Sequence, residues 1–577
     1  MTPSPTEATT PLYLGLDLST QQLKAIVVTP KLETVGQAKV DFDHDFGPRY
    51  GVRAGVIVRG DEVTAPVAMW LEALDLVLAR LADVVDLARL RAVSGAGQQH
   101  GSVFWNAEAE ELLGSLDGRR SLVDQLPAAL AHPSSPNWQD QSTQTECDGL
   151  EDLLGGRQRL AEVTGSGAHH RFTGAQIMRL RRLLPDMLAA TSRISLVSSW
   201  LASVFLGAVA PLDMADVCGM NLWDMAEQRY HEDLLALVAG GRDAADRLRR
   251  MLGEPVRDGG VSLGTVSPYF VTRYGFNRDC RVVPFTGDNP ATMLALPLRP
   301  LDAIVSLGTS TTFLMNTPVY SPDESHHFFH HPTTPGHYMF MLCYKNGGLA
   351  REKIRNELPP PENNSVNPWQ TFNDAILHTP PLDLPARDDD SNNTRAKLGL
   401  YFLLRETVPN LRAGTWRFTS RPDGTDLQPA TTPWPPSTDA RIIAESQALS
   451  MRLRSRSLVR PPRDGLPPQP RRIYLVGGGA ANPALARVIG SVLGGSDGVY
   501  RLVDVGGNAC ALGGAYKALW AVERGAGQSF DDLVAERWSE AEAVVKVDEG
   551  FCAHLYHGYG RVLPAFEEME RRLLAGE

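Results

Sequence analysis

Two short segments, one in each half of the chain, combine a glycine with hydroxyl side chains, a combination suited to binding phosphate. The segment 14–20 reads Leu-Gly-Leu-Asp-Leu-Ser-Thr and the segment 306–311 reads Ser-Leu-Gly-Thr-Ser-Thr. Glycine lets backbone N–H groups converge on an anion, and Ser or Thr hydroxyls add further donors. Each segment alone is more often an ordinary turn. Two of them together indicate a nucleoside triphosphate held from both sides of a cleft.

A carboxylate that could accept a proton stands in the segment 286–291, Thr-Gly-Asp-Asn-Pro-Ala, directly after the apolar run 282–285. A strand that ends in a Gly turn before a helix would place Asp288 at the mouth of a cleft. There it could take the proton of a substrate hydroxyl. The alternative is structural, because Asp before Asn-Pro-Ala is also typical of a helix N-cap.

A dense polar loop is expected at 94–102, Ser-Gly-Ala-Gly-Gln-Gln-His-Gly-Ser. Several donors and acceptors between glycines suit the binding of a polyol. A single histidine such as His100 is otherwise more often structural, so both interpretations stay open.

Three glycines follow an apolar strand at 473–476 and precede a helix start at Asn482-Pro483. This arrangement lets a phosphorylated or planar ligand lie against bare backbone near a helix N-terminus. It lacks the GxGxxG spacing, which disfavours a dinucleotide fold. Close backbone packing without a ligand is the alternative. Small residues at 505–515 predict a helix that packs closely.

The histidines of the segment 326–337 could suggest a metal site, but no carboxylate pattern accompanies them, and they follow Pro322 in a stretch that predicts a loop. A transition metal bound by the protein is therefore not expected.

These motifs must be positioned by hairpins and by alternating strands and helices. Strands are predicted at 11–16 and 23–28 around the first Gly turn, and at 303–307 and 312–315 around the second. Both hairpins open an α/β block, which is a faint internal repeat. We predict an arm at 1–11, an N-terminal domain at 12–298 and a C-terminal domain at 299–577. Loop insertions are expected near 356–393 and 420–471.

Composition excludes several classes of function. A chain of 577 residues is longer than one hydrophobic core usually supports, so at least two domains are expected. Its content of 43% hydrophobic and 21% charged residues is typical of a folded protein. The net charge of −11 argues against wrapping nucleic acid. Six scattered cysteines without a CxxC pair favour a reducing compartment, so a cytoplasmic location is expected. The N-terminus does not read as a secretory signal, and the apolar window 196–212 is too polar for a membrane span.

Taken together, the motifs resemble those of the FGGY carbohydrate kinases in order and spacing. The motifs that carry the resemblance are 15–20, 97–101, 286–289, 307–310 and 477–482. Within the family, four segments are similar to the eukaryotic branch that acts on D-xylulose: 98–105, 138–140, 171–174 and 342–347. The resemblance covers roughly 12–523. It implies an actin-like ATPase fold of two duplicated, ribonuclease-H-like domains flanking a cleft.

The resemblance also implies roles for single residues. Asp288 would be the base. The sugar would be bound by His100, Arg171, Asp288 and Asn289. The nucleotide would be bound by Ser19, Thr20, Thr309, Trp369, Gly478, Gly479 and Asn482. Asp17 would help to hold Mg²⁺.

The expected activity is transfer of the γ-phosphoryl group of ATP to D-xylulose, in a protein that is a monomer or a homodimer and binds neither nucleic acid nor membrane. Two alternatives remain. The first is another kinase of the family, acting on ribulose or glycerol. The second is a non-catalytic, actin-like ATP-binding protein.

Overall fold

The computed structural model describes residues 9–360, 367–385, 394–503 and 508–576. The chain divides into two compact units that are interleaved in sequence. Unit 1 comprises 1–298, 322–339 and 508–538, and unit 2 comprises 299–321, 340–507 and 539–577. Two segments that follow residue 299 therefore pack with unit 1. Most of the expected arm at 1–11 lies outside the described residues.

The sheet of unit 1 is built around the first predicted hairpin. The strand order is β12-β13-β6-β1-β2-β3, with β14 also paired to β6. β2 is antiparallel to both of its neighbours, β1 and β3. β6 runs parallel to β1, and β13 and β14 run parallel to β6. The bounds are β1 Leu12–Leu18, β2 Gln22–Val28, β3 Thr34–Asp41, β6 Leu90–Gly97, β12 Gly264–Thr265, β13 Arg281–Val282 and β14 Thr286–Gly287.

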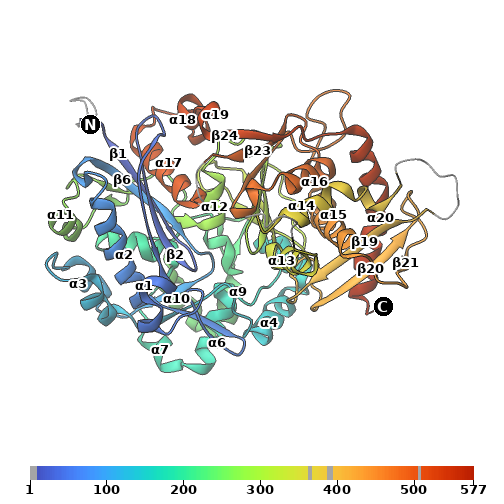
Figure 1. The fold of residues 1–577 in the computed structure, drawn as a ribbon. Coiled ribbons are helices and arrows are strands. Elements are labelled where there is room, and N and C mark those ends of the chain that lie inside the picture. Colours follow the sequence, from blue (N-terminus) through green and yellow to red (C-terminus); the bar gives the residue numbers. More distant parts are fainter. Residues whose placement is uncertain (1–8, 361–366, 386–393, 504–507, 577) are drawn as a thin grey trace. The chain divides into compact units, whose positions relative to one another are not determined.

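Helices cover both faces of this sheet, and successive residues of β1 point to opposite faces and so pack against different helices. Leu14 and Leu16 enter the core cluster that includes α2 (Val67–Ala82) and α8 (Val197–Leu206). Gly15 instead meets α17 (Ala509–Glu523), where an added Cβ would lie 1.9 Å from the Ala511 carbonyl oxygen. Figure 1 shows α17, in red, against the blue β1. The prediction of a closely packed helix of small residues is confirmed for 508–515, and 505–507 lie outside the described residues.

The sheet of unit 2 is built around the second predicted hairpin, β15 (Ala303–Leu307) and β16 (Thr311–Thr317). Its strands follow the order β18-β16-β15-β22-β23-β24. β15 is antiparallel to β16 and parallel to β22, and β22 is parallel to β23. The other bounds are β18 Tyr338–Tyr344, β22 Arg472–Val476, β23 Gly498–Leu502 and β24 Val544–Asp548.

The two sheets share one plan. In each, the first strand lies between its hairpin partner and a parallel strand that arrives after a long connection, and a further parallel strand follows. Each sheet also adds an antiparallel strand at the end, β12 in unit 1 and β24 in unit 2. This is the duplicated α/β architecture of the actin-like ATPase fold, as predicted.

Helices replace part of the loops expected in unit 2. The insertion expected at 420–471 contains α15 (Pro436–Ser455), and the described part of 356–393 contains α14 (Gln370–His378). Its start also overlaps the end of α13 (Gly348–Glu357). The loop prediction was wrong for α14, because prolines on both sides masked its apolar positions Phe372 and Ile376, which are buried.

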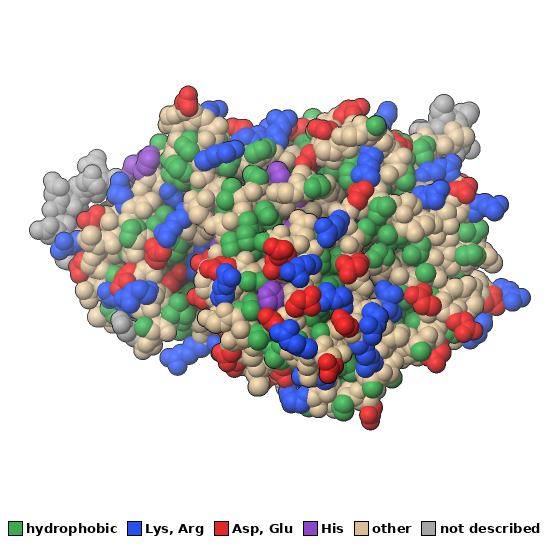
Figure 2. All heavy atoms as spheres, turned by 180° about the vertical axis from the view of Figure 1, so that it is seen from behind, with side chains coloured by type: hydrophobic (Ala, Val, Ile, Leu, Met, Phe, Trp, Pro, Cys, Tyr) green, Lys and Arg blue, Asp and Glu red, His purple; other side chains and the backbone are tan. Residues whose placement is uncertain are grey.

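Helix α8 lies in the apolar window 196–212 and is buried along nearly its whole length, as a core helix should be. Among the described residues, no helix combines the length and apolar character needed to cross a bilayer. Acidic and basic side chains are intermingled on the face of the molecule drawn in Figure 2.

Candidate active site

Asp17 is the last residue but one of β1 and holds a buried carboxylate. Its side chain is 1% exposed. Ser19 Oγ donates a hydrogen bond of 2.6 Å to Oδ2, and Lys24 Nζ lies 3.7 Å from the same oxygen. Burial raises the pKa of Asp17 above its usual range, although Lys24 and Ser19 act in the opposite direction. Oδ1 is buried and has no hydrogen-bond partner among the described residues. This oxygen is available to a cation.

Thr20 follows in the turn, and its hydroxyl belongs to a polar network. It accepts a hydrogen bond of 2.7 Å from Trp138 Nε1 and donates one of 3.3 Å to Gln98 Oε1. Asn137 Nδ2 also donates to Gln98 Oε1, at 2.6 Å. A phosphate oxygen would have to compete with Gln98 for the proton of Thr20, so the hydroxyl of Thr20 is less available to a nucleotide than the sequence suggests.

Asp288 is the first residue of α12 (Asp288–Met293), and the N-cap is Gly287. The N-cap interpretation of Asp288 was therefore wrong. Oδ1 accepts hydrogen bonds from the backbone N of Asn289 at 2.8 Å and from Asn289 Nδ2 at 3.1 Å. Asn289 Nδ2 also donates to Gln99 Oε1 at 2.9 Å. Burial, with the charge of Asp17 as a second cause, raises the pKa of Asp288 to about 7.

Asp216 is a second buried carboxylate beside Asp288, and the sequence analysis missed it. It is 2% exposed and accepts a hydrogen bond from Ser198 Oγ. Burial raises its pKa to about 7, and the charges of Asp213 and Asp288 act in the same direction. The available signal was a pair of aspartates three residues apart, Asp213 and Asp216, in the otherwise apolar stretch 208–220.

Gly287 lets these groups approach. A Cβ at Gly287 would lie 2.8 Å from both Asp216 Oδ1 and Gln99 Nε2. Only a residue without a side chain allows these two polar atoms to converge on the end of β14. Asp213 supports the same strand end, because it accepts a hydrogen bond of 2.6 Å from Thr286 Oγ1. Its other oxygen lies 3.3 Å from Nζ of the fully buried Lys517 of α17.

His100 has a backbone φ of +72°, which only a special environment imposes on a residue other than glycine. Its ring stacks on Phe172 with centroids 4.4 Å apart. Nδ1 donates a hydrogen bond of 3.1 Å to the Gly219 carbonyl, so Nε2 is left as an acceptor. Burial, and secondarily the charge of Arg171, lowers the pKa of His100 well below its usual range. The imidazole of His100 is therefore neutral.

Arg171 is 5% exposed and lies beside both His100 and a histidine from far along the chain. Its Nη2 is 3.3 Å from Nε2 of His327. His327 belongs to β17 (His327–His330), all of whose residues are buried. The loop prediction for this histidine segment was wrong over 327–330, because two phenyl rings between two imidazoles are all buried and the segment forms a strand. Among the described residues, no group of three or more His, Cys, Asp or Glu side chains is placed to hold a metal ion.

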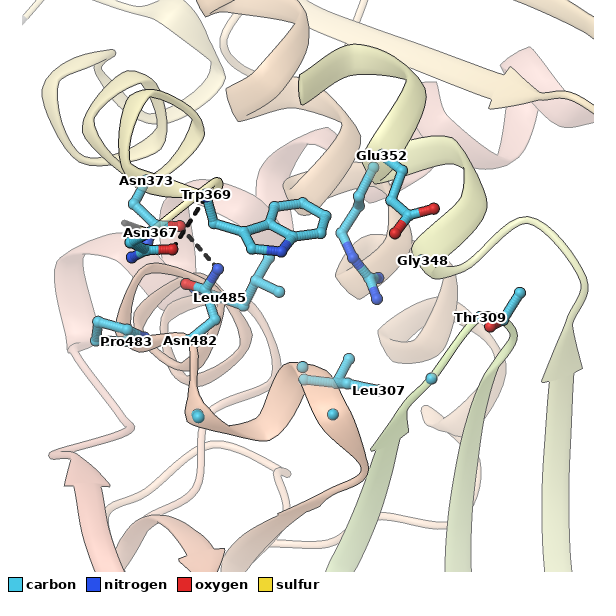
Figure 3. Close-up of a pocket in the computed structure, with 15 residues that line it drawn as sticks. Leu307, Thr309, Gly348, Glu352, Asn367, Trp369, Asn373, Asn482, Pro483 and Leu485 are labelled. Carbon is cyan, nitrogen blue, oxygen red and sulfur yellow. Dashed lines mark hydrogen bonds between the residues drawn. The ribbon is translucent and has the colours of Figure 1, made fainter. Parts of the chain in front are cut away.

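Unit 2 contains a cavity of about 570 Å³ beside the second hairpin. Figure 3 shows Thr309, Trp369 and Asn482 around it. Six residues with predicted nucleotide roles or in the Gly turn line this cavity together: Gly308, Thr309, Trp369, Gly478, Gly479 and Asn482. The volume lies in the range typical of small-molecule sites.

Both interpretations of the glycines at 477–479, close backbone packing and contact with a ligand, are consistent with the structure. A Cβ on Gly479 would lie 2.9 Å from Leu307 Cβ, and Gly477 has a φ of +84°, so these two serve close packing and the turn. A Cβ on Gly478 would meet nothing within 4 Å, and this glycine lines the cavity. Gly478 therefore leaves backbone open to a ligand.

Trp369 and Asn482 form one wall of the cavity. The guanidinium carbon of Arg355 lies 4.5 Å from the Trp369 ring centroid. Asn482 Oδ1 caps α16 (Pro483–Leu493) by accepting from the backbone N of Ala484 at 3.0 Å, and its Nδ2 donates to Asn373 Oδ1 at 2.7 Å. The wall thus offers an aromatic face beside an asparagine that is fixed by hydrogen bonds, which suits a planar base.

Comparisons with known proteins agree on one family. The models of the N- and C-terminal domains of the FGGY family of carbohydrate kinases match residues 134–295 and 303–522. The chain is 54% identical over 572 residues to the probable D-xylulose kinase A of Neosartorya fischeri, covering 98% of each chain. It is 53% identical over 573 residues to the D-xylulose kinase A of Aspergillus niger, covering 98% of this chain and 99% of the other.

Solved structures show the same fold at low identity. The xylulose kinase of Bifidobacterium adolescentis matches with a TM-score of 0.68 and 20% identity, covering 96% of this chain and 99% of that one. The gluconate kinase of Lactobacillus acidophilus matches with a TM-score of 0.74 and 14% identity, covering 98% and 99%. Similar TM-scores for enzymes named after different substrates show that the fold alone does not choose the substrate.

Proposed function

The chain belongs to the FGGY family of carbohydrate kinases, and on this premise we propose that it transfers the γ-phosphoryl group of ATP to a hydroxyl of D-xylulose, giving D-xylulose 5-phosphate and ADP. Near full-length likeness to D-xylulose kinases supports the choice of sugar. The structural observation that carries the chemistry is the buried carboxylate of Asp288, whose pKa is raised to about 7.

Asp288 is proposed as the base. As the bond between the sugar oxygen and the γ-phosphorus forms, the bond from that phosphorus to the bridging oxygen of ADP breaks, and the hydroxyl proton passes to the carboxylate of Asp288. A carboxylate with a pKa near the working pH is a better proton acceptor than an ordinary aspartate. Asn289 fixes Oδ1 through two hydrogen bonds, which orients the carboxylate group.

His100, Arg171 and Asn289 are proposed to bind the sugar. The unprotonated Nε2 of His100 can accept a hydrogen bond from a sugar hydroxyl, whereas the guanidinium of Arg171 and the amide of Asn289 can donate hydrogen bonds to sugar oxygens. Because His100 and Arg171 are both almost fully buried, a bound polyol would exchange its water hydrogen bonds for these groups. Gln99 and Asp216, which meet at Gly287, extend the same polar lining.

The cavity of unit 2 is proposed to bind ATP. Gly308, Thr309 and Gly478 offer backbone and hydroxyl groups to phosphate, and Trp369 with Asn482 offers an aromatic and amide wall to the base. Gly479 packs closely against Leu307, the last residue of β15, and so lets the glycine segment 477–479 approach the second hairpin. Ser19 Oγ donates a hydrogen bond to Asp17, so we propose that it orients this carboxylate and can donate to a phosphate oxygen only after its hydroxyl rotates away from Asp17.

Asp17 fits a magnesium ion. The orphaned, buried Oδ1 is an anionic oxygen of the kind that Mg²⁺ prefers, and one carboxylate is enough because Mg²⁺ commonly keeps waters and substrate phosphates as its other ligands. When bound, Mg²⁺ neutralises charge on the phosphates of ATP. Lys24 balances the charge of Asp17 in its absence.

The test is ADP release with D-xylulose, D-ribulose, ketohexoses and glycerol as acceptors. We expect the highest kcat/KM for D-xylulose. A higher value for D-ribulose or glycerol would contradict the choice of sugar while leaving the kinase activity intact. No acceptor-dependent ADP release, together with nucleotide binding, would favour a non-catalytic ATP-binding protein.

A cytoplasmic location and a monomeric or homodimeric state remain part of the proposal. Fractionation of cells that express the protein, and light scattering of the purified chain, measure these two properties directly.

A further inference from the structure

Arg351 lines the cavity of unit 2 although its side chain is 97% buried. It lies in the first turn of α13, immediately behind the second hairpin. The backbone N of Gly348 donates a hydrogen bond of 3.1 Å to the Gly308 carbonyl, and that of Leu349 donates one of 3.2 Å to the Thr309 carbonyl. The start of α13 is thereby fixed to the turn that is proposed to hold phosphate.

Two neutral side chains hold the guanidinium of Arg351. Its Nη1 donates to Gln447 Oε1 at 2.6 Å and to Thr311 Oγ1 at 3.5 Å. Gln447 is fixed in turn, because its Nε2 donates to the carbonyls of Asn346 and Gly347. Nε and Nη2 of Arg351 have no hydrogen-bond partner among the described residues. The guanidinium is therefore oriented on one side only.

The charge of Arg351 is not balanced by an ion pair within the described part of unit 2. Glu352 also lines the cavity but is exposed and makes no ion pair with it. By contrast, the buried Arg441 and Arg454 of α15 pair with Glu445 and Glu570. A buried cation is costly unless an anion or several hydrogen bonds compensate for its lost hydration. Burial lowers the pKa of Arg351 to about 10, although the charge of Glu352 acts in the opposite direction.

The geometry points to Arg351 as a phosphate-binding residue of the nucleotide site, whose missing counter-charge is the polyphosphate of ATP or ADP. This inference rests on the proposed nucleotide site and assigns to it a residue that none of the sequence motifs includes. A guanidinium forms paired, charge-assisted hydrogen bonds with phosphate oxygens, and Nε with Nη2 is one edge of the group that makes such pairs.

The test compares ADP with adenosine, which lacks the phosphates, by isothermal titration. We expect Arg351→Met to weaken ADP binding about 10- to 100-fold, as expected for hydrogen bonds to a charged group, and to leave the Kd for adenosine unchanged. Arg351→Lys keeps the charge but loses the fork, so its Kd for ADP should lie between those of the wild type and Arg351→Met.

Arg452 provides the matched control. It is a largely buried arginine on α15 that donates to the carbonyls of Val492 and Tyr556, and it does not line the cavity. Arg452→Met should leave the ADP-to-adenosine affinity ratio at its wild-type value, whatever it does to thermal stability. The same change of ratio in Arg452→Met would overturn the inference.

Three further outcomes are decisive. Unchanged ADP affinity in Arg351→Met would overturn the role of Arg351, as would equal losses for ADP and adenosine, which would mean a purely structural role. If Arg351→Met does not fold, Arg351→Lys decides by the same ratio. A wild-type protein that binds neither ADP nor adenosine would overturn the nucleotide site itself, and with it this inference.

Discussion

Nη2 of Arg171 lies 3.3 Å from Nε2 of His327, and because arginine can only donate, this imidazole nitrogen must accept. The proton of the neutral ring then resides on Nδ1, which donates to Ser166 Oγ at 2.9 Å. Burial and the charge of Arg171 lower the pKa of His327 well below its usual range, which keeps the ring in this neutral form. His327 is thus a positioning residue for a guanidinium that is proposed to bind sugar.

We expect His327→Ala to raise the KM for D-xylulose about tenfold or more, because Arg171 loses its buried acceptor. The KM for ATP should not change, since His327 does not line the cavity of unit 2. His327→Gln retains an acceptor oxygen and should restore most of the sugar affinity. Steady-state kinetics with each substrate varied in turn measures both constants.

His330 is the matched control for His327. It is a buried histidine of the same strand whose ring stacks on Tyr338. His330→Ala should leave the KM for D-xylulose within about twofold of wild type. If it raises this KM as much as His327→Ala does, packing of β17 rather than the contact with Arg171 is responsible.

Removal of the proposed base should affect turnover and not binding. Asp288→Asn keeps an oxygen that can accept from the backbone N of Asn289, so the local structure and the sugar affinity should persist. We expect kcat to fall about 10²- to 10⁴-fold, the usual contribution of a general base. Rapid-quench measurement of D-xylulose 5-phosphate gives the chemical step, and calorimetry gives the Kd for the sugar. Near wild-type turnover would exclude Asp288 as the base.

The raised pKa of Asp288 predicts a pH dependence with a definite sign. The carboxylate accepts a proton only when it is ionised, so kcat/KM for D-xylulose should fall about tenfold per pH unit below pH 7 and level off above it. The pKa of Asp216 is also raised to about 7, but Asp216 takes no proton in the proposed reaction, so Asp216→Asn should leave the acid limb near pH 7 and its slope unchanged. An acid limb near pH 4 in the wild type would contradict this assignment.

The raised pKa of Asp288 also predicts that stability falls as pH rises, whereas activity increases. Between about pH 4 and pH 7 the folded protein keeps a proton on Asp288 that the unfolded chain has released. The folded state therefore binds more protons, and the free energy of unfolding falls as pH rises through this window. Asp288→Asn should flatten that dependence, which thermal unfolding at a series of pH values measures in the absence of substrate and Mg²⁺.

Local sequence signals were enough to predict the hairpins and the residues that stand at their turns. A glycine turn between two apolar runs shows where a strand ends to within a few residues. Asp17, Thr309 and Asp288 could therefore be placed near strand ends from sequence alone. The duplication was visible for the same reason, because β1 and β15 each begin a sheet with the same hairpin.

Contacts between distant segments could not be predicted in this way. Asp216 and His327 join Asp288 and Arg171 only through tertiary packing, and neither lies in a motif. The small residues at 505–515 predict a closely packed helix, but not that this helix packs on β1 in unit 1. Arg351 was overlooked because its significance lies in a missing partner, which a sequence cannot show.

Gly15 offers a test of the packing that carries Asp17. An alanine Cβ at this position would lie 1.9 Å from the Ala511 carbonyl oxygen and 2.4 Å from the Ala515 nitrogen, both atoms of helix backbone that cannot rotate away. We expect Gly15→Ala to lower the free energy of unfolding by about 1–3 kcal/mol or more, the cost of overpacking a core.

The control is Gly558→Ala within α20 (Ala553–Leu574), where a Cβ meets nothing within 4 Å. There alanine should raise stability by about 0.5–1 kcal/mol through its helix propensity. Urea unfolding measures both changes, and equal stability of Gly15→Ala and wild type would contradict the close approach of α17 to β1.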